Sequence, residues 1–402
     1  MSALTELQRS PRFLASLVAI TAIGPLSMQI FLPALPAIQR DFAAAPGAVQ
    51  LALSLSMVAI ALATLGYGPI SDHYGRRPVV IAGLGLFLVG TAVCAAAPDV
   101  PSLIAGRILQ AAGGSSGMVL ARAIVRDVYP DAQVAQAIAY LTMAMVVAPM
   151  VAPAVGGALT DLFGWRANFV FVGVVGAAVA ALMVSRLPET NRSPAPLQGL
   201  AGTLSGFVRL LRAPIFCGYV FQGAFSAGSF FAFASGAPYV MVDVLGRPAT
   251  EYGLYFIFLG LAYIAGNYVS ARTSGRLGIH PMLVAGSVLA LVGALLTAAL
   301  ALAFPWSAPL IFGPGILIGF ATGLTMPNAQ AGAVSYAPRA AGTASGLAGF
   351  LQMLLAAFFA QVVGSLQDGT PYPMIGFMVL ASTLALASIS LALWLDRRQA
   401  AG

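Results

Sequence analysis

The sequence predicts an all-α polytopic membrane protein whose twelve transmembrane helices form two six-helix bundles. First, 59% of the 402 residues are hydrophobic and only 8% are charged, whereas a soluble domain carries roughly 25% charged residues. Second, apolar runs long enough to span a bilayer, about 20 residues, recur from one end of the chain to the other. Third, the 44 glycines and 26 prolines suit membrane helices, in which neighbouring helices satisfy freed backbone groups.

The positions of these runs give the spans. The first run starts near Phe13 and reaches its end without a clear small-residue cleavage site. We therefore expect it to be retained as a spanning helix rather than removed as a signal peptide. The predicted spans lie near 13–36, 47–70, 78–97, 100–125, 134–160, 164–186, 214–238, 250–271, 279–303, 307–328, 341–366 and 372–395.

The most polar and proline-rich stretch lies near the middle of the chain and separates six spans from six. This arrangement favours two halves that arose by duplication, a plan found in transporters with parallel repeats. We predict an N-terminal six-helix bundle over residues 1–186, a cytoplasmic linker over 187–213 and a C-terminal six-helix bundle over 214–402.

Orientation follows from the arginines, which account for all 19 positively charged side chains. With a cytoplasmic N-terminus, the outer side carries only Arg40, Arg166 and Arg247. Cytoplasmic loops are enriched in basic residues, so we expect a multi-pass protein of the bacterial inner membrane, embedded in lipid, with both termini in the cytoplasm. The arginines are dispersed over short loops, which argues against a nucleic-acid partner. Those on the inner side are Arg9, Arg12, Arg76, Arg77, Arg122, Arg126, Arg186, Arg192, Arg209, Arg212, Arg272, Arg276, Arg339, Arg397 and Arg398.

The strongest local motif lies between the second and third spans and reads Gly68-Pro-Ile-Ser-Asp72-His-Tyr-Gly75-Arg76-Arg77-Pro78. An acid and two arginines stand here at the membrane–water boundary, where Asp72 can pair with an arginine or cap a helix end. We expect Gly68 to permit close helix approach and Gly75 to permit a tight turn. Taken alone, the stretch is also compatible with a plain basic loop. The pattern resembles the loop motif of the major facilitator superfamily, whose fold is two six-helix bundles.

Span four extends the resemblance. Arg107 is followed by Gln110 and a glycine pair, similar to the superfamily's Arg-x-x-Gln-Gly pattern. An arginine in the apolar zone is costly unless it is paired or hydrated, which makes Arg107 a candidate functional residue. In the alternative, the side chain extends to the outer end of the span.

Span five carries a glycine- and proline-rich segment that resembles the motif typical of antiporters. Proline removes a backbone hydrogen bond and glycine lets helices touch, so the segment can bend and pack tightly. Ala148 and Ala152 stand where glycines are usual, so the match is partial. The matching residues are Pro149, Pro153, Gly156 and Gly157.

Three further segments narrow the resemblance to the bicyclomycin and chloramphenicol resistance subfamily of drug:proton antiporters. They are Phe31-Leu-Pro33-Ala-Leu-Pro36, Ala123-Ile-Val-Arg126-Asp127-Val-Tyr129 and Trp165-Arg166. Together with the motifs above they cover nearly the whole chain. The resemblance implies export of small organic molecules in exchange for protons.

One departure from the subfamily bears on coupling, because its members carry an acid in span one where this chain has Gln29. Burial favours the protonated form of a carboxylate, which suits proton coupling, and Gln29 does not titrate. Either an acid at a span end has taken over the coupling, or the coupling differs in kind, or the protein is a facilitator. The twelve acids all lie in loops or at span ends: Asp41, Asp99, Asp161, Asp243, Glu251 and Asp368 outside, Glu6, Asp72, Asp127, Asp131, Glu189 and Asp396 inside.

Helical spacing outlines a path for substrate and coupling ion. Met28 and Gln29 share a face of span one, and amide, aromatic and methionine side chains suit apolar or aromatic ligands. The alternative for an aromatic residue is a lipid-facing or interfacial position, and for an amide it is an interhelical hydrogen bond. The candidates are Gln29, Arg107, Met28, Phe31, Tyr219, Gln222, Phe233, Tyr255, Asn267, Asn328 and Gln352.

We expect no enzyme activity, because the spans hold no paired acids and no nucleophile with a base. His73 and His280 are separated and have no acid cluster nearby, so neither a metal site nor a cofactor is predicted. The sequence favours a monomeric secondary exporter of small drug-like, amphipathic or aromatic molecules, coupled to protons and working by alternating access. The alternative is a facilitator, or an exporter of one metabolite or anion, without the usual carboxylate coupling.

Overall fold

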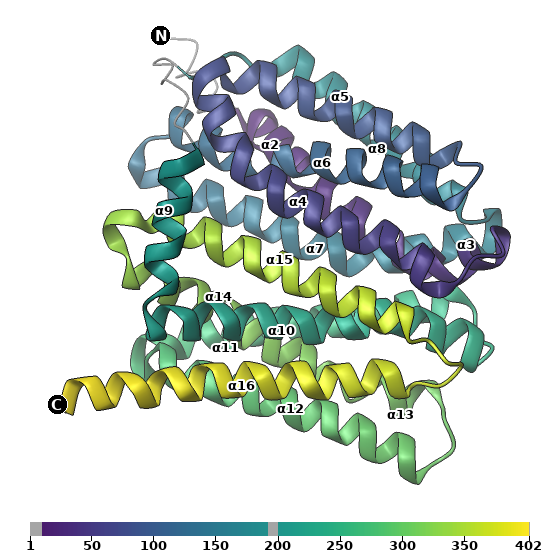
Figure 1. Ribbon diagram of the computed structural model, residues 1–402. Helices are drawn as coiled ribbons and strands as arrows, with labels where there is room; N and C mark the ends of the chain where they lie inside the picture. The colour runs from purple at the N-terminus through teal and green to yellow at the C-terminus, as the bar shows by residue number, and fades with distance from the viewer. Residues whose placement is uncertain (1–9, 192–199, 402) are drawn as a thin grey trace. The chain divides into compact units, whose positions relative to one another are not determined.

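The structure, a computed structural model, describes residues 10–191 and 200–401. Every regular element in these ranges is a helix, and twelve helices or groups of consecutive helices are long and apolar enough to cross a membrane. The predicted all-α fold with twelve spans is confirmed (Figure 1). Glu6, Arg9, Arg192 and the linker residues 192–199, which entered the predictions above, lie outside the described residues.

The chain divides into two compact units, and each is described by itself. Unit 1 comprises residues 1–44 and 51–198, and unit 2 comprises residues 45–50 and 199–402. The division after residue 198 falls within the stretch predicted to be a linker.

Unit 1 contains the first six spans, joined by short connections, except for the first five residues of the second span, which belong to unit 2. Their ends differ from the predicted ones by a few residues, as for the fifth span, where a helix over 134–160 was expected and Asp131–Phe163 is found. The elements are α2 (Pro11–Gln29), η1 (Leu32–Ala34), α3 (Leu35–Asp41), α4 (Pro46–Tyr74), α5 (Arg76–Ala95), α6 (Val100–Val128), α7 (Asp131–Phe163) and α8 (Arg166–Arg186).

Local sequence signals explain where several of these helices begin. Asp99 caps α6, because its carboxylate accepts a hydrogen bond from the Ser102 backbone N–H at 2.8 Å. Hydrogen bonds from Ser102 also hold the pKa of Asp99 below its ordinary value. Gly75 and Gly164 stand at the turns before α5 and α8 with φ of 99° and 82°, a conformation that favours glycine. The tight turn predicted at Gly75 is confirmed.

Glycines bring α5 and α6 into close contact. A side chain at Gly90 of α5 would overlap the backbone of Gln110, and one at Gly113 of α6 would overlap the backbone of Phe87. Small residues of this kind allow the backbones of membrane helices to approach closely. The contact holds Gln110 of α6 directly beside α5.

Two of the glycine predictions concern contacts between helices. Gly156 of α7 lies against the Ile30 carbonyl, where a side chain would overlap it, so the close contact expected at Gly156 is confirmed. The close approach expected at Gly68 is wrong, since no atom lies within 4 Å of the position that a side chain there would occupy. This turn of α4 faces the surface, with Ile70 39% exposed.

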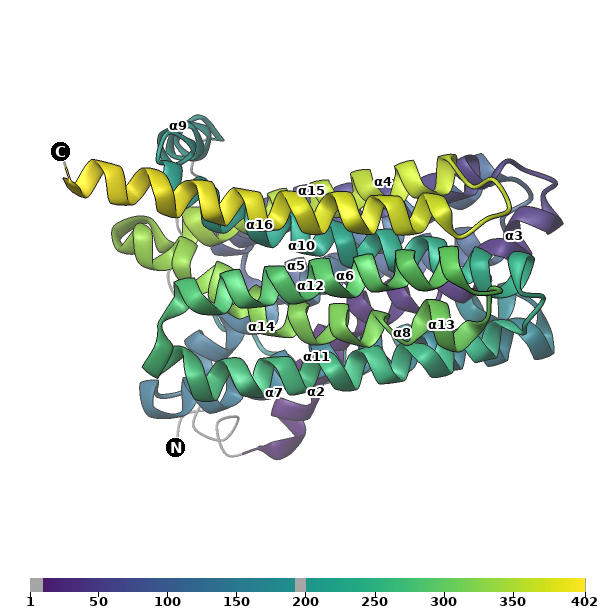
Figure 2. The ribbon, with the colours of Figure 1, turned by 90° about the horizontal axis from the view of Figure 1, so that it is seen from below.

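Unit 2 contains the remaining six spans and a shorter helix, α9, that precedes them. Helix α9 crosses the direction in which α10, α15 and α16 run, as Figures 1 and 2 show. The elements are α9 (Leu200–Leu211), α10 (Pro214–Tyr239), η2 (Val240–Val244), α11 (Ala249–Leu277), α12 (Ile279–Ala303), α13 (Ala308–Phe312), α14 (Gly315–Tyr336), η3 (Pro338–Ala340), α15 (Ala341–Ser365) and α16 (Tyr372–Ala401).

Three spans are interrupted. The first continues through η1, a 3₁₀ turn that contains Pro33, and the seventh passes from α10 into the π-helical η2 just after Pro238. The tenth is divided between α13 and α14 at Gly313 and Pro314. Proline lacks a backbone N–H, which disturbs the regular helical bonding, and interrupted helices are where transporters expose polar backbone and bind their substrates.

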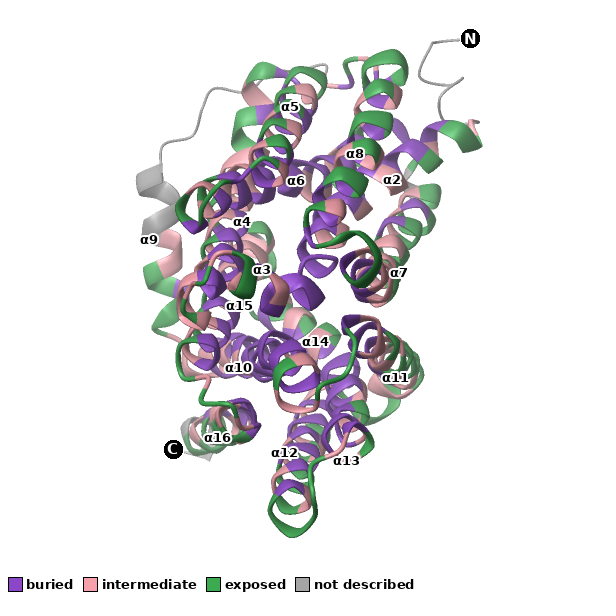
Figure 3. Cartoon of the chain, turned by 90° about the vertical axis from the view of Figure 1, so that its right-hand side faces the viewer, coloured by how far each residue is buried: buried purple, intermediate pink, exposed green. Residues whose placement is uncertain are grey.

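Helix α10 forms the centre of unit 2. In its most apolar window 72% of the residues are buried, compared with 22% for α11 (Figure 3). It packs against α14, α15 and α16, so polar side chains on α10 must find their hydrogen-bond partners inside the unit.

Candidate functional site

Arg107 lies on the side of α6 that packs against the first span. It is 1% exposed and is the one charged residue that is buried among the described residues. Its Nη1 donates to the Ser27 carbonyl at 3.1 Å and to Oε1 of Gln110. The guanidinium carbon lies 4.5 Å from the centre of the Phe31 ring. Arg107 therefore stays inside unit 1 and does not extend to the end of its span.

No carboxylate pairs with this guanidinium in the part of the chain that the structure describes. The neighbouring hydrogen bonds are neutral: Gln110 donates to the Thr91 hydroxyl at 2.9 Å, and Thr91 donates to the Phe87 carbonyl at 2.7 Å. The Nε of Arg107 has no hydrogen-bond partner. An arginine at the centre of a membrane helix costs about 2.5–3.5 kcal/mol on insertion scales. An unused donor on a costly buried charge is suited to a ligand that comes and goes.

Met28, Gln29 and Phe31 lie at the break in the first span. Met28 and Gln29 are 7% and 5% exposed, and Oε1 of Gln29 has no hydrogen-bond partner. The Phe31 ring packs against Phe169 of α8, with 5.9 Å between ring centroids. Arg107 contacts Ser27 and Phe31, which stand on either side of Gln29 in the sequence. The predicted residues Phe31 and Arg107 therefore come together, and Gln29 belongs to the segment between the two contacts.

The polar residues predicted on span seven bond to neighbouring helices in unit 2. Gln222 is fully buried, and its Nε2 lies 3.0 Å from the hydroxyls of Ser226 and of Ser287 on α12. The Tyr219 hydroxyl lies 2.6 Å from Nε2 of His280. These contacts favour the alternative given for the amides, interhelical hydrogen bonds, over a position on an open substrate path.

Two predicted aromatic residues of unit 2 form a cluster at the break of the tenth span. The rings of Phe233 and Tyr255 lie 5.5 Å and 5.2 Å from the ring of Phe312, measured between centroids. Phe233 is 1% exposed, and Gly315 lies directly against it. The cluster is an aromatic contact, largely buried, that α10, α11 and α13 build together.

The remaining amides of unit 2 lie apart from one another. Asn328 of α14 donates to the Ser270 hydroxyl on α11 at 2.7 Å. Asn267 donates to a carbonyl of its own helix. Gln352 of α15 faces Gly223 of α10, where a side chain would meet its amide. The Asn328 side chain therefore forms an interhelical hydrogen bond. Asn267 and Gln352 do not share a common site with it.

The loop motif forms an ion-pair network at one end of unit 1. Arg76 pairs with Asp72, four residues before it, and with Asp127 at the end of α6, where Nε lies 3.0 Å from the carboxylate. The expected pairing of Asp72 with an arginine is confirmed. Arg77 takes another direction and donates to the Val184 carbonyl on α8 at 3.1 Å.

Sequence reasoning missed the residues that hold this loop in place, Glu189 to Asn191, which we name the strap. The Glu189 carboxylate accepts hydrogen bonds from the backbone N–H groups of Arg76 at 2.9 Å and Arg77 at 3.1 Å. Asn191 donates to the Asp72 carbonyl at 2.8 Å. The strap therefore caps the first turn of α5 and the last turn of α4 together.

Gly75 makes this capping possible. It precedes α5 without a side chain that could cap the helix, and a side chain there would overlap the Glu189 carboxylate. Thr190 adds a bond from its hydroxyl to Asp127 at 3.1 Å. The available sequence signal was an acid and an asparagine directly after the sixth span, which alone does not indicate the loop they cap.

Two other motifs also serve packing in unit 1. Trp165 and Arg166 both donate to the Asp41 carboxylate, at 3.0 Å and 2.8 Å, and so join the end of α3 to the start of α8. Pro149 and Pro153 lie inside α7, which continues through both. Gly157, next to the contact glycine Gly156, is buried.

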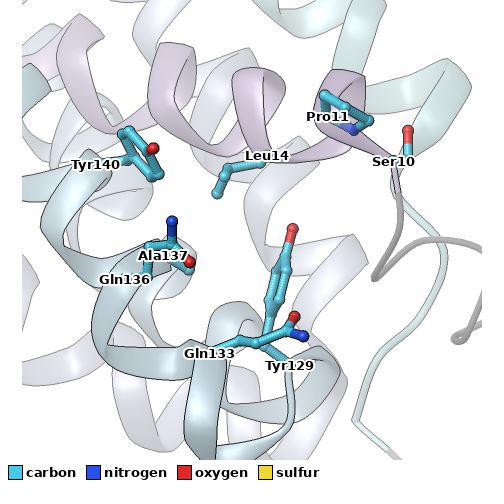
Figure 4. Close-up of a pocket in the computed structure, with 8 residues that line it drawn as sticks. All are labelled: Ser10, Pro11, Leu14, Tyr129, Gln133, Gln136, Ala137 and Tyr140. Carbon is cyan, nitrogen blue, oxygen red and sulfur yellow. The ribbon is translucent and has the colours of Figure 1, made fainter.

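A cavity of 280 Å³ lies between the start of α2 and the start of α7. Tyr129 and Tyr140 present their rings to the space beside Leu14, as Figure 4 shows. None of the residues predicted for the substrate path lines it. The lining residues are Ser10, Pro11, Leu14, Tyr129, Gln133, Gln136, Ala137 and Tyr140. Within the described ranges, no three His, Cys, Asp or Glu side chains gather as metal ligands would.

Residues 17–361 match the family described as Major Facilitator Superfamily. The chain belongs to the major facilitator superfamily. It is 30% identical over 383 residues to the bicyclomycin resistance protein homolog of Haemophilus influenzae, and the match covers 93% of this chain and 94% of that protein. It is also 30% identical over 392 residues to multidrug resistance protein D of Escherichia coli, with 95% and 97% covered.

Solved structures of other transporters share the superfamily fold. A transporter of the POT family in complex with 5-aminolevulinic acid aligns with a TM-score of 0.78 at 13% identity, over 97% of this chain and 98% of that one. A D-xylose–proton symporter aligns with a TM-score of 0.72 at 16% identity, over 93% and 96%. Superfamily membership makes the protein a multi-pass membrane transporter of small molecules, so the resemblance predicted from the motifs is confirmed.

Proposed function

We propose that this superfamily member exports small drug-like, amphipathic or aromatic molecules in exchange for protons, by alternating access. The observation that carries the proposal is the similarity, over more than 90% of the chain, to relatives named for bicyclomycin resistance and multidrug resistance. Export of a toxic compound produces resistance. In unit 1, the buried Arg107 beside the Phe31 ring supplies one polar point on an apolar surface, a combination that suits such ligands.

The proposal includes the setting in which the transporter works. It is a monomer of the bacterial inner membrane with both termini in the cytoplasm, in line with the arginine bias. Residues 1–186 and 214–402 act as the moving bundles and 187–213 join them. Its partners are the substrate, protons and the surrounding lipid.

Proton coupling is assigned to an acid at a span end. Among the described residues no carboxylate is buried, and Gln29 occupies the place of the subfamily's span-one acid. The acids Asp72 and Asp127 bond to Arg76, so a proton on either one would weaken the network that fixes the α4–α5 loop. Protonation and movement of the bundle would thereby be linked.

The experiment is export into everted membrane vesicles that carry the protein, with a fluorescent aromatic cation such as ethidium as substrate. We expect accumulation when the vesicle interior is acidified and its collapse when nigericin dissipates the pH gradient. Vesicles without the protein provide the background. Concentrative export that persists without any ion gradient would rule out proton coupling.

A second candidate function follows from the unpaired charge of Arg107. A buried guanidinium without a carboxylate attracts anions, which favours a facilitator or an exporter of a specific anionic metabolite. In that case, anionic aromatic compounds would move down their gradient at a rate independent of pH, and ethidium would not be transported. The same vesicles, loaded with a panel of anionic and cationic compounds, distinguish the two functions.

A further inference from the structure

A groove of 240 Å³ runs between α10 and α16 in unit 2. Its residues follow one another at the i, i+3, i+4 and i+7 spacing that defines one helix face. The one hydroxyl among them, that of Ser388, bonds to a carbonyl of its own helix at 2.7 Å, so the groove offers an apolar surface. The lining residues are Pro214, Cys217, Gly218 and Phe221 from α10 and Ser388, Leu391, Ala392 and Leu395 from α16.

The dimensions of the groove suit a chain-like ligand. Pockets that enclose a drug-sized molecule measure roughly 300–1,000 Å³, more than this groove provides. Both of its walls are spans, and Leu391 on its edge is 58% exposed. A hydrocarbon chain from the bilayer fits a narrow, apolar and laterally open groove.

Two arginines flank the end of the groove where α10 begins and α16 ends. Arg212 precedes Pro214 by two residues and is exposed. Arg398 stands seven residues after Leu391 and three after Leu395, so it continues the stripe that lines the groove. The Arg398 guanidinium carbon lies 3.8 Å from the centre of the Trp394 ring, and tryptophan is enriched at the membrane–water interface.

Helix α9 places a further arginine at this level. Its Leu210 is buried in unit 2, whereas Val208 and Leu211 on the same helix are 55% and 39% exposed. The Leu211 carbonyl accepts a hydrogen bond from the Cys217 thiol at 3.1 Å, which joins α9 to the groove. A helix that crosses the spans (Figure 1) with exposed apolar residues and the exposed Arg209 has the composition of an interfacial helix.

We propose that the groove binds one phospholipid with an anionic headgroup, such as phosphatidylglycerol. One acyl chain lies along α10 and α16, and the phosphate lies between Arg212 and Arg398. The acid at this end of α16, Asp396, follows Ala392 by four residues and therefore lies beside the stripe that lines the groove; with two arginines against one acid, this end of the groove keeps a positive charge. The inference does not depend on which substrate the transporter exports.

The first test is native mass spectrometry of the full-length protein with an equimolar mixture of dioleoyl phosphatidylglycerol and dioleoyl phosphatidylcholine. We expect preferential retention of phosphatidylglycerol, reduced about 5-fold by Arg212→Gln and again by Arg398→Gln. Arg397→Gln is the matched control, because Arg397 lies on the far side of the same helix end. Joint replacement of Arg212 and Arg398 by lysine keeps the charge and should keep the preference.

Equal retention of the two lipids by the wild-type protein, or an equal loss in Arg397→Gln, would overturn the proposal.

The second test uses the natural thiol in the groove, Cys217, since the other cysteine, Cys94, is buried. Phosphatidylglycerol should slow the reaction of Cys217 with N-ethylmaleimide by a factor at least as large as its preference over phosphatidylcholine in the first test. Glycerol 3-phosphate should leave the reaction rate unchanged. Protection by glycerol 3-phosphate alone would show that a headgroup without an acyl chain occupies the site, which contradicts the proposal.

Discussion

At the scale of single residues, Arg107 carries a buried charge that only neutral groups surround. Replacement by alanine removes that charge and the cost of burying it, together with its hydrogen bonds to Ser27 and Gln110. We expect Arg107→Ala to fold in the membrane with an unchanged or higher melting temperature and to lose about 10-fold or more in export rate. Thermal unfolding and vesicle export measure the two effects. Export at the wild-type rate would leave Arg107 a structural role only.

Gln29 permits a test of the coupling assignment. Burial disfavours the charged form of a carboxylate, and Oε1 of Gln29 is buried without a partner. We expect Gln29→Asp to change the pH dependence of export by adding a titration between about pH 6 and 8, while Gln29→Asn, which adds no titratable group, keeps the wild-type pH profile. If the aspartate variant keeps the wild-type profile and substrate range, Gln29 lies off the path of substrate and proton.

The sequence predicted that Arg107 matters, but not what surrounds it. The residue type and its position alone indicate that an arginine in an apolar span is energetically costly. The stacking on Phe31 and the chain through Gln110 to Thr91 depend on how α2, α5 and α6 are rotated, which one sequence does not specify. The same limit explains why Gln222 and Asn328, predicted for the path, proved to be bonded to neighbouring helices.

At the scale of helices, the strap stabilises the α4–α5 loop by capping the ends of both helices. A lost cap costs about 0.5–2 kcal/mol, and charge-assisted bonds lie at the upper end of such values. We therefore expect Glu189→Ala to lower the melting temperature and the export rate, with Glu189→Gln in between. Glu251→Ala is the control, because Glu251 reaches the exposed Arg247 only at 3.9 Å. Equal melting temperatures for Glu189→Ala and the wild type would contradict the capping role.

Some properties of the helices follow from short-range patterns and some do not. Apolar length alone gave the twelve spans, and Pro33 and Pro238 stand where the first and seventh spans are interrupted. The strap was beyond such reasoning, because Glu189 caps a helix that begins 113 residues earlier in the sequence. Gly68 shows the opposite error, since a motif glycine need not mark a helix contact.

At the scale of the whole molecule, we propose that both termini lie in the cytoplasm, because the described residues hold twelve spans and cytoplasmic loops are enriched in basic residues. An alkaline phosphatase fusion at the C-terminus should therefore be inactive. A fusion within residues 304–307, between α12 and α13, should be active, because this loop follows the ninth span. The reverse pattern of activities would invert the proposed orientation.

The buried charge of unit 1 also has an electrical consequence. Moving one elementary charge across the membrane is worth about 2.3 kcal/mol per 100 mV. Arg107 is a cation, and no carboxylate is buried among the described residues, so unit 1 has no buried carboxylate that could gain or lose charge during a turnover. The current per cycle is then set by the substrate's own charge and by ions bound near the two surfaces. Neutral and cationic substrates should accordingly respond differently to voltage.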